Sequence, residues 1–288
     1  MNIFNPEELQ SEKRNMKNTG VNTVLILGLV RGVQESNYNL EKLIKLLKLN
    51  ELKYTVAADL KLIYCLLGIS AHGGKYACCY CEGEKDCKNG KLRTFQSLTN
   101  WYQKFIEDGE LNKDMKNYKN VVRPCLIEES GETLVIDIVP PPELHLFEHI
   151  VMQITDVLIA EESIKKFLIG KTVTRHGYNG GGFDGPNCQK VLSCLDELIT
   201  IAPLLMRPCI ETLRKFKIVT EGCFGMKLSL EFSRDIQEFV SEMCNLHKYL
   251  IEYTTHKICL GWKFHIIQSH LVMFLERKNK PLEIFSEL

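Results

Sequence analysis

Residues 21–68 decide the fold class that we expect, and they read VNTVLILGLVRGVQESNYNLEKLIKLLKLNELKYTVAADLKLIYCLLG. Two apolar runs, 21–30 and 52–58, have the length and composition of buried strands. Between them, residues 39–49 carry leucine and isoleucine at helical spacing. A strand, a helix and a second strand within one short stretch predict a βαβ unit, whose parallel strands need a right-handed crossover.

The rest of the chain predicts mainly helices, apart from a short strand at 134–139 that three prolines stop. The expected helices lie at 59–68, 95–107, 143–162, 187–202, 208–218, 232–252 and 264–276. We therefore expect three parts: a polar lead-in at 1–20, a partial α/β unit at 21–70 and a mainly helical domain at 71–288.

Composition narrows the class of protein. The 288 residues hold 36 basic and 36 acidic side chains, so no global positive field indicates nucleic-acid binding. No apolar run is long enough to cross a membrane, and the polar first 20 residues predict no secretory signal. Twelve cysteines without such a signal indicate reduced thiols or metal ligands, in the nucleus or the cytosol.

Two spaced pairs predict a metal site. Cys78 and Cys81 form a C-x2-C pair, and His265 and His270 form an H-x4-H pair. Both spacings suit tetrahedral zinc, whose ligating atoms should lie within roughly 4 Å of one another. More than half of the chain separates the pairs, so such a site would join distant segments. The spacing leaves alternatives open: Cys79 and the cysteine at position 87 compete as ligands, or the thiols and imidazoles only pack.

Three other motifs give weaker evidence for a functional site. Asp59 follows an expected strand, where a carboxylate could hold Mg²⁺, although the local sequence favours an N-cap of the next helix. The glycines at 180–182 fit neither phosphate-binding pattern, which disfavours a nucleotide cofactor. His145 and His149 share a helix face but lack the HExxH arrangement, so we expect a helix start rather than a protease.

The order of these motifs resembles a known family. It runs Asp59, Cys78-x2-Cys81, PPPELH at 140–145, YNGGGF at 178–183 and His265-x4-His270. This order is similar to the catalytic core of DDE recombinases related to the V(D)J recombinase large subunit and the Transib transposases. The resemblance implies a partial RNase H-like sheet with a large helical insertion, in which Cys78, Cys81, His265 and His270 bind a structural zinc ion. It also implies that Asp59 is the second carboxylate of a DDE triad.

Two departures from the family change the expected activity. No aspartate precedes Asp59, and the chain ends soon after His270, before a final catalytic glutamate helix. A two-metal Mg²⁺ site needs several carboxylates, so we expect a truncated, transposase-derived protein without strand cleavage, in which Asp59 is a remnant. The expected partners are DNA, another protein or a second copy of the chain. The alternative function is a zinc-stabilised protein-interaction module.

Overall fold

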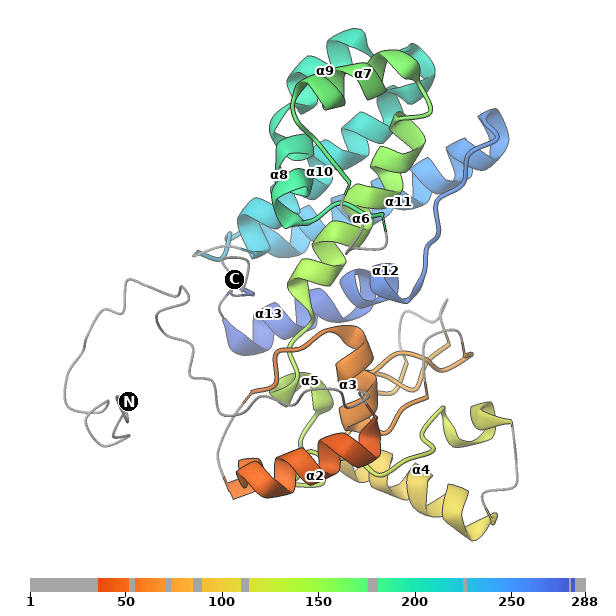
Figure 1. Ribbon diagram of the computed structural model, residues 1–288, viewed down its shortest axis with the longest axis vertical. Helices are drawn as coiled ribbons and strands as arrows, with labels where there is room; N and C mark the ends of the chain where they lie inside the picture. Colours follow the sequence, from red (N-terminus) through yellow and green to blue (C-terminus); the bar gives the residue numbers. More distant parts are fainter. Residues whose placement is uncertain are drawn as a thin grey trace, which may run out of the picture.

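A computed structural model shows a mainly helical protein (Figure 1). It describes residues 36–51, 55–70, 74–84, 90–109, 114–175, 181–224, 227–279 and 281–282. Helices α2 to α5 lie at one end of the molecule and α6 to α11 at the other, and a helix built from α12 and α13 crosses between them. None of the described helices combines the length and hydropathy that a membrane crossing requires.

The N-terminal part is held together by short helices with well-defined ends. They are α2 (Asn37–Leu47), the 3-10 turn η2 (Leu49–Glu51), α3 (Leu60–Leu67), α4 (Phe95–Glu107), the 3-10 turn η3 (Met115–Tyr118) and α5 (Val135–Ile138). Helix α3 ends at Gly68, which has φ of 71°. A Cβ atom there would lie 2.1 Å from the carbonyl oxygen of Arg123, so only glycine fits this position.

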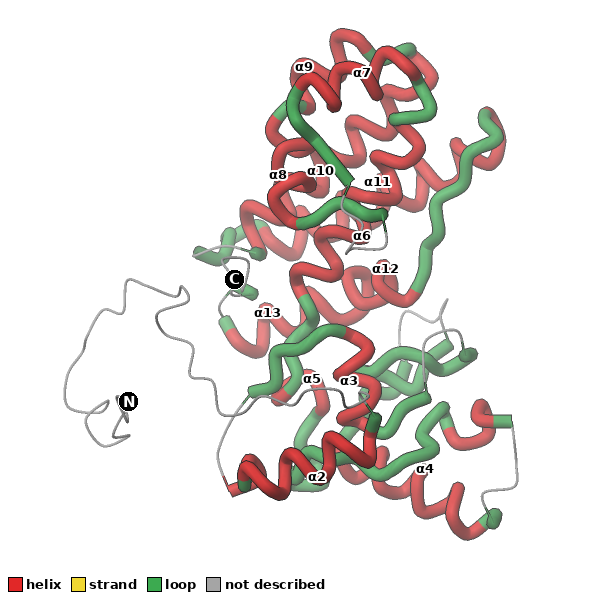
Figure 2. The backbone as a smooth tube through the Cα atoms, viewed as in Figure 1, coloured by secondary structure: helices red, strands yellow, loops and turns green. Residues whose placement is uncertain are grey.

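The expected α/β unit is wrong. The described residues contain no strand, as the absence of yellow in Figure 2 shows, and only isolated bridges occur among them. Residues 55–58 form neither helix nor strand, and the amide of Val56 donates to the carbonyl of Ile138 at 2.8 Å. Residues 21–30, the other expected strand, lie outside the described residues. The partial RNase H-like sheet is therefore not part of the described fold.

The expected strand at 134–139 is also wrong. The amide of Val139 donates to the carbonyl of Val135 at 2.8 Å, which closes the single helical turn α5. The β-branched composition of this segment favoured a strand, but no described segment pairs with it along its length. Tertiary packing therefore decides the local structure here, with Val135 and Ile136 both buried.

The C-terminal part is helical, as predicted, with three differences in its helices. The helix expected at 143–162 ends at Leu158, the helix expected at 187–202 is divided at Cys194, and a helix at Glu162–Gly170 was not predicted. This part contains α6 (Glu143–Leu158), α7 (Glu162–Gly170), α8 (Gly185–Ser193), α9 (Leu195–Ile201), the 3-10 turn η5 (Leu204–Met206), α10 (Arg207–Cys223) and α11 (Phe232–Tyr253). A series of aromatic rings forms the centre of its core. The ring of Phe216 lies 6.2 Å from that of Phe147 and 4.8 Å from that of Phe239, and Phe239 lies 6.4 Å from Phe264.

One irregular helix links the two parts. It consists of α12 (Trp262–Ile266), the π-helical turn η6 (Ile267–Leu271) and α13 (Val272–Lys278). It packs against α6 and α11 on one side. Toward the N-terminal part, Arg277 on α13 donates from Nε to Asp137 on α5 at 2.9 Å. The chain thus returns to its N-terminal part through this helix.

Candidate metal centre

The two cysteines lie in the connection between α3 and α4, where the chain turns back on itself. Cys81 forms an antiparallel bridge with Leu92. Beside it, the amide of Arg93 donates to the carbonyl of Tyr80 at 2.9 Å. This short pairing holds Cys78 and Cys81 on one rigid turn.

Two further features fix the sulfur atoms within that turn. A Cβ atom on Gly90 would lie 2.6 Å from the Cα atom of Gly83 and 2.9 Å from the Sγ atom of Cys81, so the returning chain needs a glycine there. The backbone amide of Tyr80 donates to the Sγ atom of Cys78 at 3.4 Å. This contact fixes the position of the Cys78 sulfur relative to the backbone of the turn.

The two histidines reach the turn from the irregular helix. In an α-helix, residues five apart differ by about 140° around the axis, at about 100° per residue. The π turn η6 hydrogen-bonds residues five apart and therefore stacks them, which brings His265 and His270 to one face. The ring of Trp262 lies 5.3 Å from His265 and the ring of Tyr80 lies 5.6 Å from His270, so both imidazoles are packed in place.

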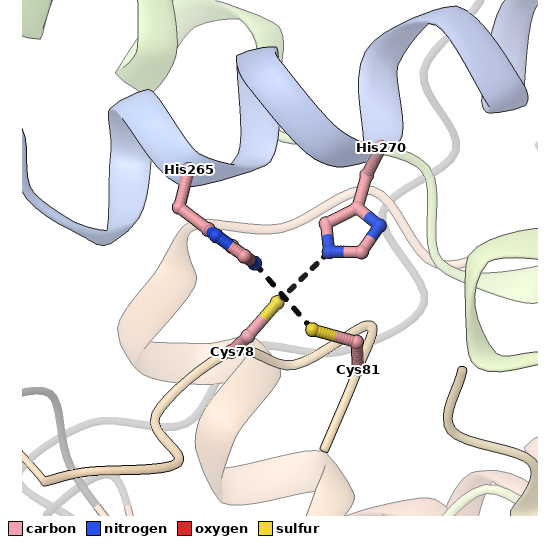
Figure 3. Close-up of side chains that lie close together, drawn as sticks. All are labelled: Cys78, Cys81, His265 and His270. Atoms are coloured by element: carbon pink, nitrogen blue, oxygen red, sulfur yellow. Dashed lines mark hydrogen bonds between the residues drawn. The ribbon is translucent and has the colours of Figure 1, made fainter. Parts of the chain in front are cut away.

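The structure brings all four predicted ligands together (Figure 3). One ligating atom from each lies within 4.8 Å of the other three, slightly wider than the roughly 4 Å expected. The Cys78 Sγ to His270 Nε2 distance is 3.3 Å, and the Cys81 Sγ to His265 Nε2 distance is 3.4 Å. Zinc–sulfur and zinc–nitrogen bonds of about 2.3 and 2.0 Å in a tetrahedron put sulfur and nitrogen about 3.5 Å apart. The two measured distances match that edge.

All four side chains are buried. Their exposed fractions are 1% and 0% for Cys78 and Cys81, and 2% for each of His265 and His270. A tetrahedral ion with four protein ligands has no open position for water or substrate, which is the property of structural rather than catalytic zinc sites. The arrangement can therefore hold a metal and join two segments, but it offers no place for a reacting molecule.

The sulfur atoms differ in their acidity. The pKa of Cys81 lies far below its ordinary value because the Cys78 thiol donates a hydrogen bond to it, and because His265 and His270 do so as well. The lowered pKa favours the thiolate form of Cys81, the form in which cysteine binds a metal, whereas burial raises the pKa of Cys78. Burial also raises the pKa of the neighbouring Cys79 to about 12. Cys79 is buried outside the cluster, which removes it as a ligand of this site.

A buried arginine lies behind the cysteine turn. Arg93 has no exposed surface, and its Nε atom donates to the carbonyl oxygens of Cys78 at 2.9 Å and Cys81 at 3.1 Å. Its Nη2 atom donates to the carbonyls of Tyr76 at 3.1 Å and Lys119 at 2.8 Å. One guanidinium thus fixes the backbone of both candidate ligands. We did not predict Arg93 from the sequence, since a single arginine in an otherwise ordinary segment carries no pattern.

Asp59 lies outside this centre and has a local role. It is exposed and is the N-cap of α3, where its Oδ1 atom accepts a hydrogen bond from the amide of Leu62 at 2.7 Å. This is the capping alternative that the sequence left open. Among the described residues, the only group of three or more histidine, cysteine and acidic side chains able to hold one ion is the Cys2His2 cluster.

The remaining candidates that the structure describes do not join the cluster either. The cysteine at position 87 lies outside the described residues. His145 and His149 lie on α6, as expected of a helix start, and the Nε2 atom of His149 is 2.7 Å from the Nε2 atom of Gln153. The glycine-rich loop at 177–185 is described only from residue 181 onwards.

The fold and the site define a mainly helical protein with a buried Cys2His2 candidate metal centre. A comparison of the chain with protein-family models and with curated proteins finds no match.

Proposed function

We propose that the chain is a zinc-stabilised helical module in which one structural zinc ion joins the cysteine turn to the α12–α13 helix. The observation that carries this proposal is the convergence of four buried ligating atoms from two segments 184 positions apart, as Cys81 and His265 are. One shared ion would explain why all four ligating atoms lie within 4.8 Å of one another.

The donor set favours zinc over other metals. Two thiolates and two imidazoles are the ligands of many structural zinc sites. Magnesium and calcium prefer oxygen ligands, and iron–sulfur clusters are usually held by cysteines alone. Zinc with two thiolates is also electrically neutral, which lowers the cost of burying the centre.

The resemblance to DDE recombinases enters the proposal as the origin of the module. It is supported by the assembly of the same four residues that the resemblance named as zinc ligands. A catalytic Mg²⁺ site is not part of the proposal, because Asp59 caps a helix and has no carboxylate cluster around it among the described residues. The module would act by binding a partner.

Metal content tests the proposal directly. We expect the purified chain to contain one zinc ion, measured by mass spectrometry of the metal and by the spectrum of the Co²⁺-substituted protein. The Cys81→Ala variant should lose the ion. Cys79→Ala is the matched control, because Cys79 is equally buried and two residues away but lies outside the cluster.

A folded wild-type chain that binds neither zinc nor cobalt would sink the proposal, as would loss of the ion in the Cys79→Ala variant alone. The kind of partner is a separate question. A DNA complex whose affinity falls steeply with salt would indicate phosphate contacts and a nucleic-acid partner. The absence of such a complex would favour a protein partner.

A further inference from the structure

A cavity of about 470 Å³ lies where the two parts of the molecule meet. Its walls are mainly apolar and include Ala57, Ala58, the three prolines at 140–142, Phe274 and Leu282. This volume and composition lie in the range of sites that bind small organic molecules. The cavity is separate from the metal centre, and none of the four candidate ligands lines it.

One buried carboxyl group borders this cavity. Glu143, the first residue of α6, is only 9% exposed. Among the described residues, Glu143 is the one buried acidic side chain. No described residue forms a hydrogen bond or an ion pair with its side chain. Its carboxyl oxygens keep contact with solvent space, and a carboxylate that no described group pairs can bind a positively charged ligand.

The other charged groups of the cavity are already engaged. Asp137 accepts from Arg277, and the Nζ atom of Lys278 donates to the Asp137 carbonyl at 3.0 Å. Lys278 is therefore held by Asp137 rather than by Glu143. Asp59 is a further acidic group of the lining, whose one lysine is already paired with Asp137.

We propose that this cavity binds a small organic amine, whose ammonium group pairs with the Glu143 carboxylate while its apolar part lies against the prolines and Phe274. An ammonium ion supplies both the charge and the hydrogen-bond donors that the carboxylate lacks. An anionic ligand would instead face Glu143 and Asp59. The proposal does not rest on the zinc proposal, because it uses other residues.

Binding should depend on pH in a defined direction. Burial raises the pKa of Glu143 to about 8, so the carboxyl is mainly protonated at neutral pH. An ammonium ligand favours the ionised form, and affinity should therefore rise between pH 6 and pH 8 with release of a proton. The titratable and charged groups lining the two cavities that Glu143 borders are Asp59, Asp137, His145, Lys278, Lys217 and Glu221.

Glu143 also borders a second cavity of about 390 Å³, between α6, α8 and α10. Two filling variants separate the two spaces. Ala58 lines only the first cavity and Ser193 only the second. Ala58→Phe should abolish amine binding, whereas Ser193→Phe should leave it unchanged.

The experiment uses the full chain as purified and titration calorimetry with phenethylamine. The neutral analogue phenethyl alcohol and the anionic analogue hydrocinnamate are the matched ligands. We expect millimolar binding of the amine, with a preference of about tenfold over the alcohol, since a fragment of this size has little binding energy to gain. The Glu143→Gln variant, which keeps the side-chain shape, should remove that preference.

Glu148→Gln is the control variant, because Glu148 lies on the same helix but does not line the cavity. Thermal unfolding confirms that each variant is folded. Three outcomes would each overturn the proposal. The wild type could bind the amine and the alcohol equally, or Glu143→Gln could keep the preference for the amine. Alternatively, Ser193→Phe could abolish amine binding while Ala58→Phe leaves it unchanged.

Discussion

At the scale of single residues, the candidate metal centre depends on a side chain that would not itself touch the ion. Arg93 donates to the carbonyls of both Cys78 and Cys81 from a fully buried position. Residues that orient the ligands of a metal site commonly have a large effect on its affinity for the metal, although they do not touch the ion. The guanidinium therefore acts as a positioning group for the cysteine turn.

Replacing Arg93 by lysine should weaken zinc binding without abolishing it. The ammonium group keeps the charge but lacks the planar fork that reaches several carbonyls at once. We expect the zinc dissociation constant to rise about tenfold or more, measured by competition with a chromophoric chelator. Arg214→Lys is the control, since Arg214 is paired with Asp196 and Glu211 on the surface. An unchanged affinity in the Arg93 variant would show that the turn holds its shape alone.

Glu143 leads to a prediction about stability and pH. Its pKa is about 8 in the folded protein because of burial, well above the ordinary carboxyl value. A raised folded-state pKa means that the stabilising contribution is present at low pH and is lost as pH rises toward 8. Each unit of pKa shift corresponds to about 1.4 kcal/mol. The unfolding free energy of Glu143→Gln should therefore equal that of the wild type near pH 4. At pH 9 it should be higher than that of the wild type by several kcal/mol.

Urea denaturation at pH 4, 7 and 9 measures this difference. A difference that stays constant over that range would show that Glu143 ionises freely in the folded protein. The same result would remove the pH dependence expected for amine binding.

At the scale of elements, the π turn η6 explains why the histidine spacing works. A π turn amounts to one extra residue in an α-helix, and here it converts a five-residue spacing into a shared face. The sequence predicted a helix at 264–276 and the H-x4-H pair separately. It could not predict their combination, because a regular helix would have turned one imidazole away from the other.

Shortening and lengthening this turn by one residue should have opposite effects on zinc binding. Deleting Ser269 leaves the histidines four apart in a regular α-helix, still on one face, and keeps the register of the residues that follow. We expect this variant to bind zinc. Inserting an alanine after Ser269 should turn His270 away and abolish binding. Zinc stoichiometry and circular dichroism of the two variants provide the measurement, and the reverse outcome would contradict the π-turn explanation.

The elements that the sequence predicted correctly are those with a long amphipathic period. Helices α6 and α11 have apolar residues at helical spacing over many turns, and this local pattern is sufficient. Residues 134–139 form only one helical turn, and their β-branched composition gave the wrong structure. A strand forms a sheet only when another strand pairs with it. The apolar run at 52–58 favours a strand by its composition, but its own residues do not show whether a partner strand is present.

At the scale of the whole molecule, the cysteine and histidine pairs were predictable by spacing but their meeting depends on the entire fold. The chain leaves the cysteine turn, builds α4 to α11 and returns through α12 and α13 before the site is complete. Arg93, Glu143 and the cavity emerge only from that packing. Local patterns therefore predicted the ligands, and three-dimensional structure was needed for the residues that position them.

Removal of zinc should accordingly loosen both parts of the molecule. The proposed ion closes a loop of more than 180 residues, as the 184-position separation of Cys81 and His265 shows. The unfolded chain has no preformed site, so the free energy of zinc binding adds to the stability of the folded protein. We expect a chelator to lower the unfolding temperature and to increase amide exchange in the cysteine turn and in α12–α13 together. Exchange in the centre of α10 and α11, which pack on each other, should change less.

The Cys81→Ala variant should show the same exchange pattern without chelator and no further change with it. Exchange that increases on only one side of the site would mean that the ion does not join the two segments.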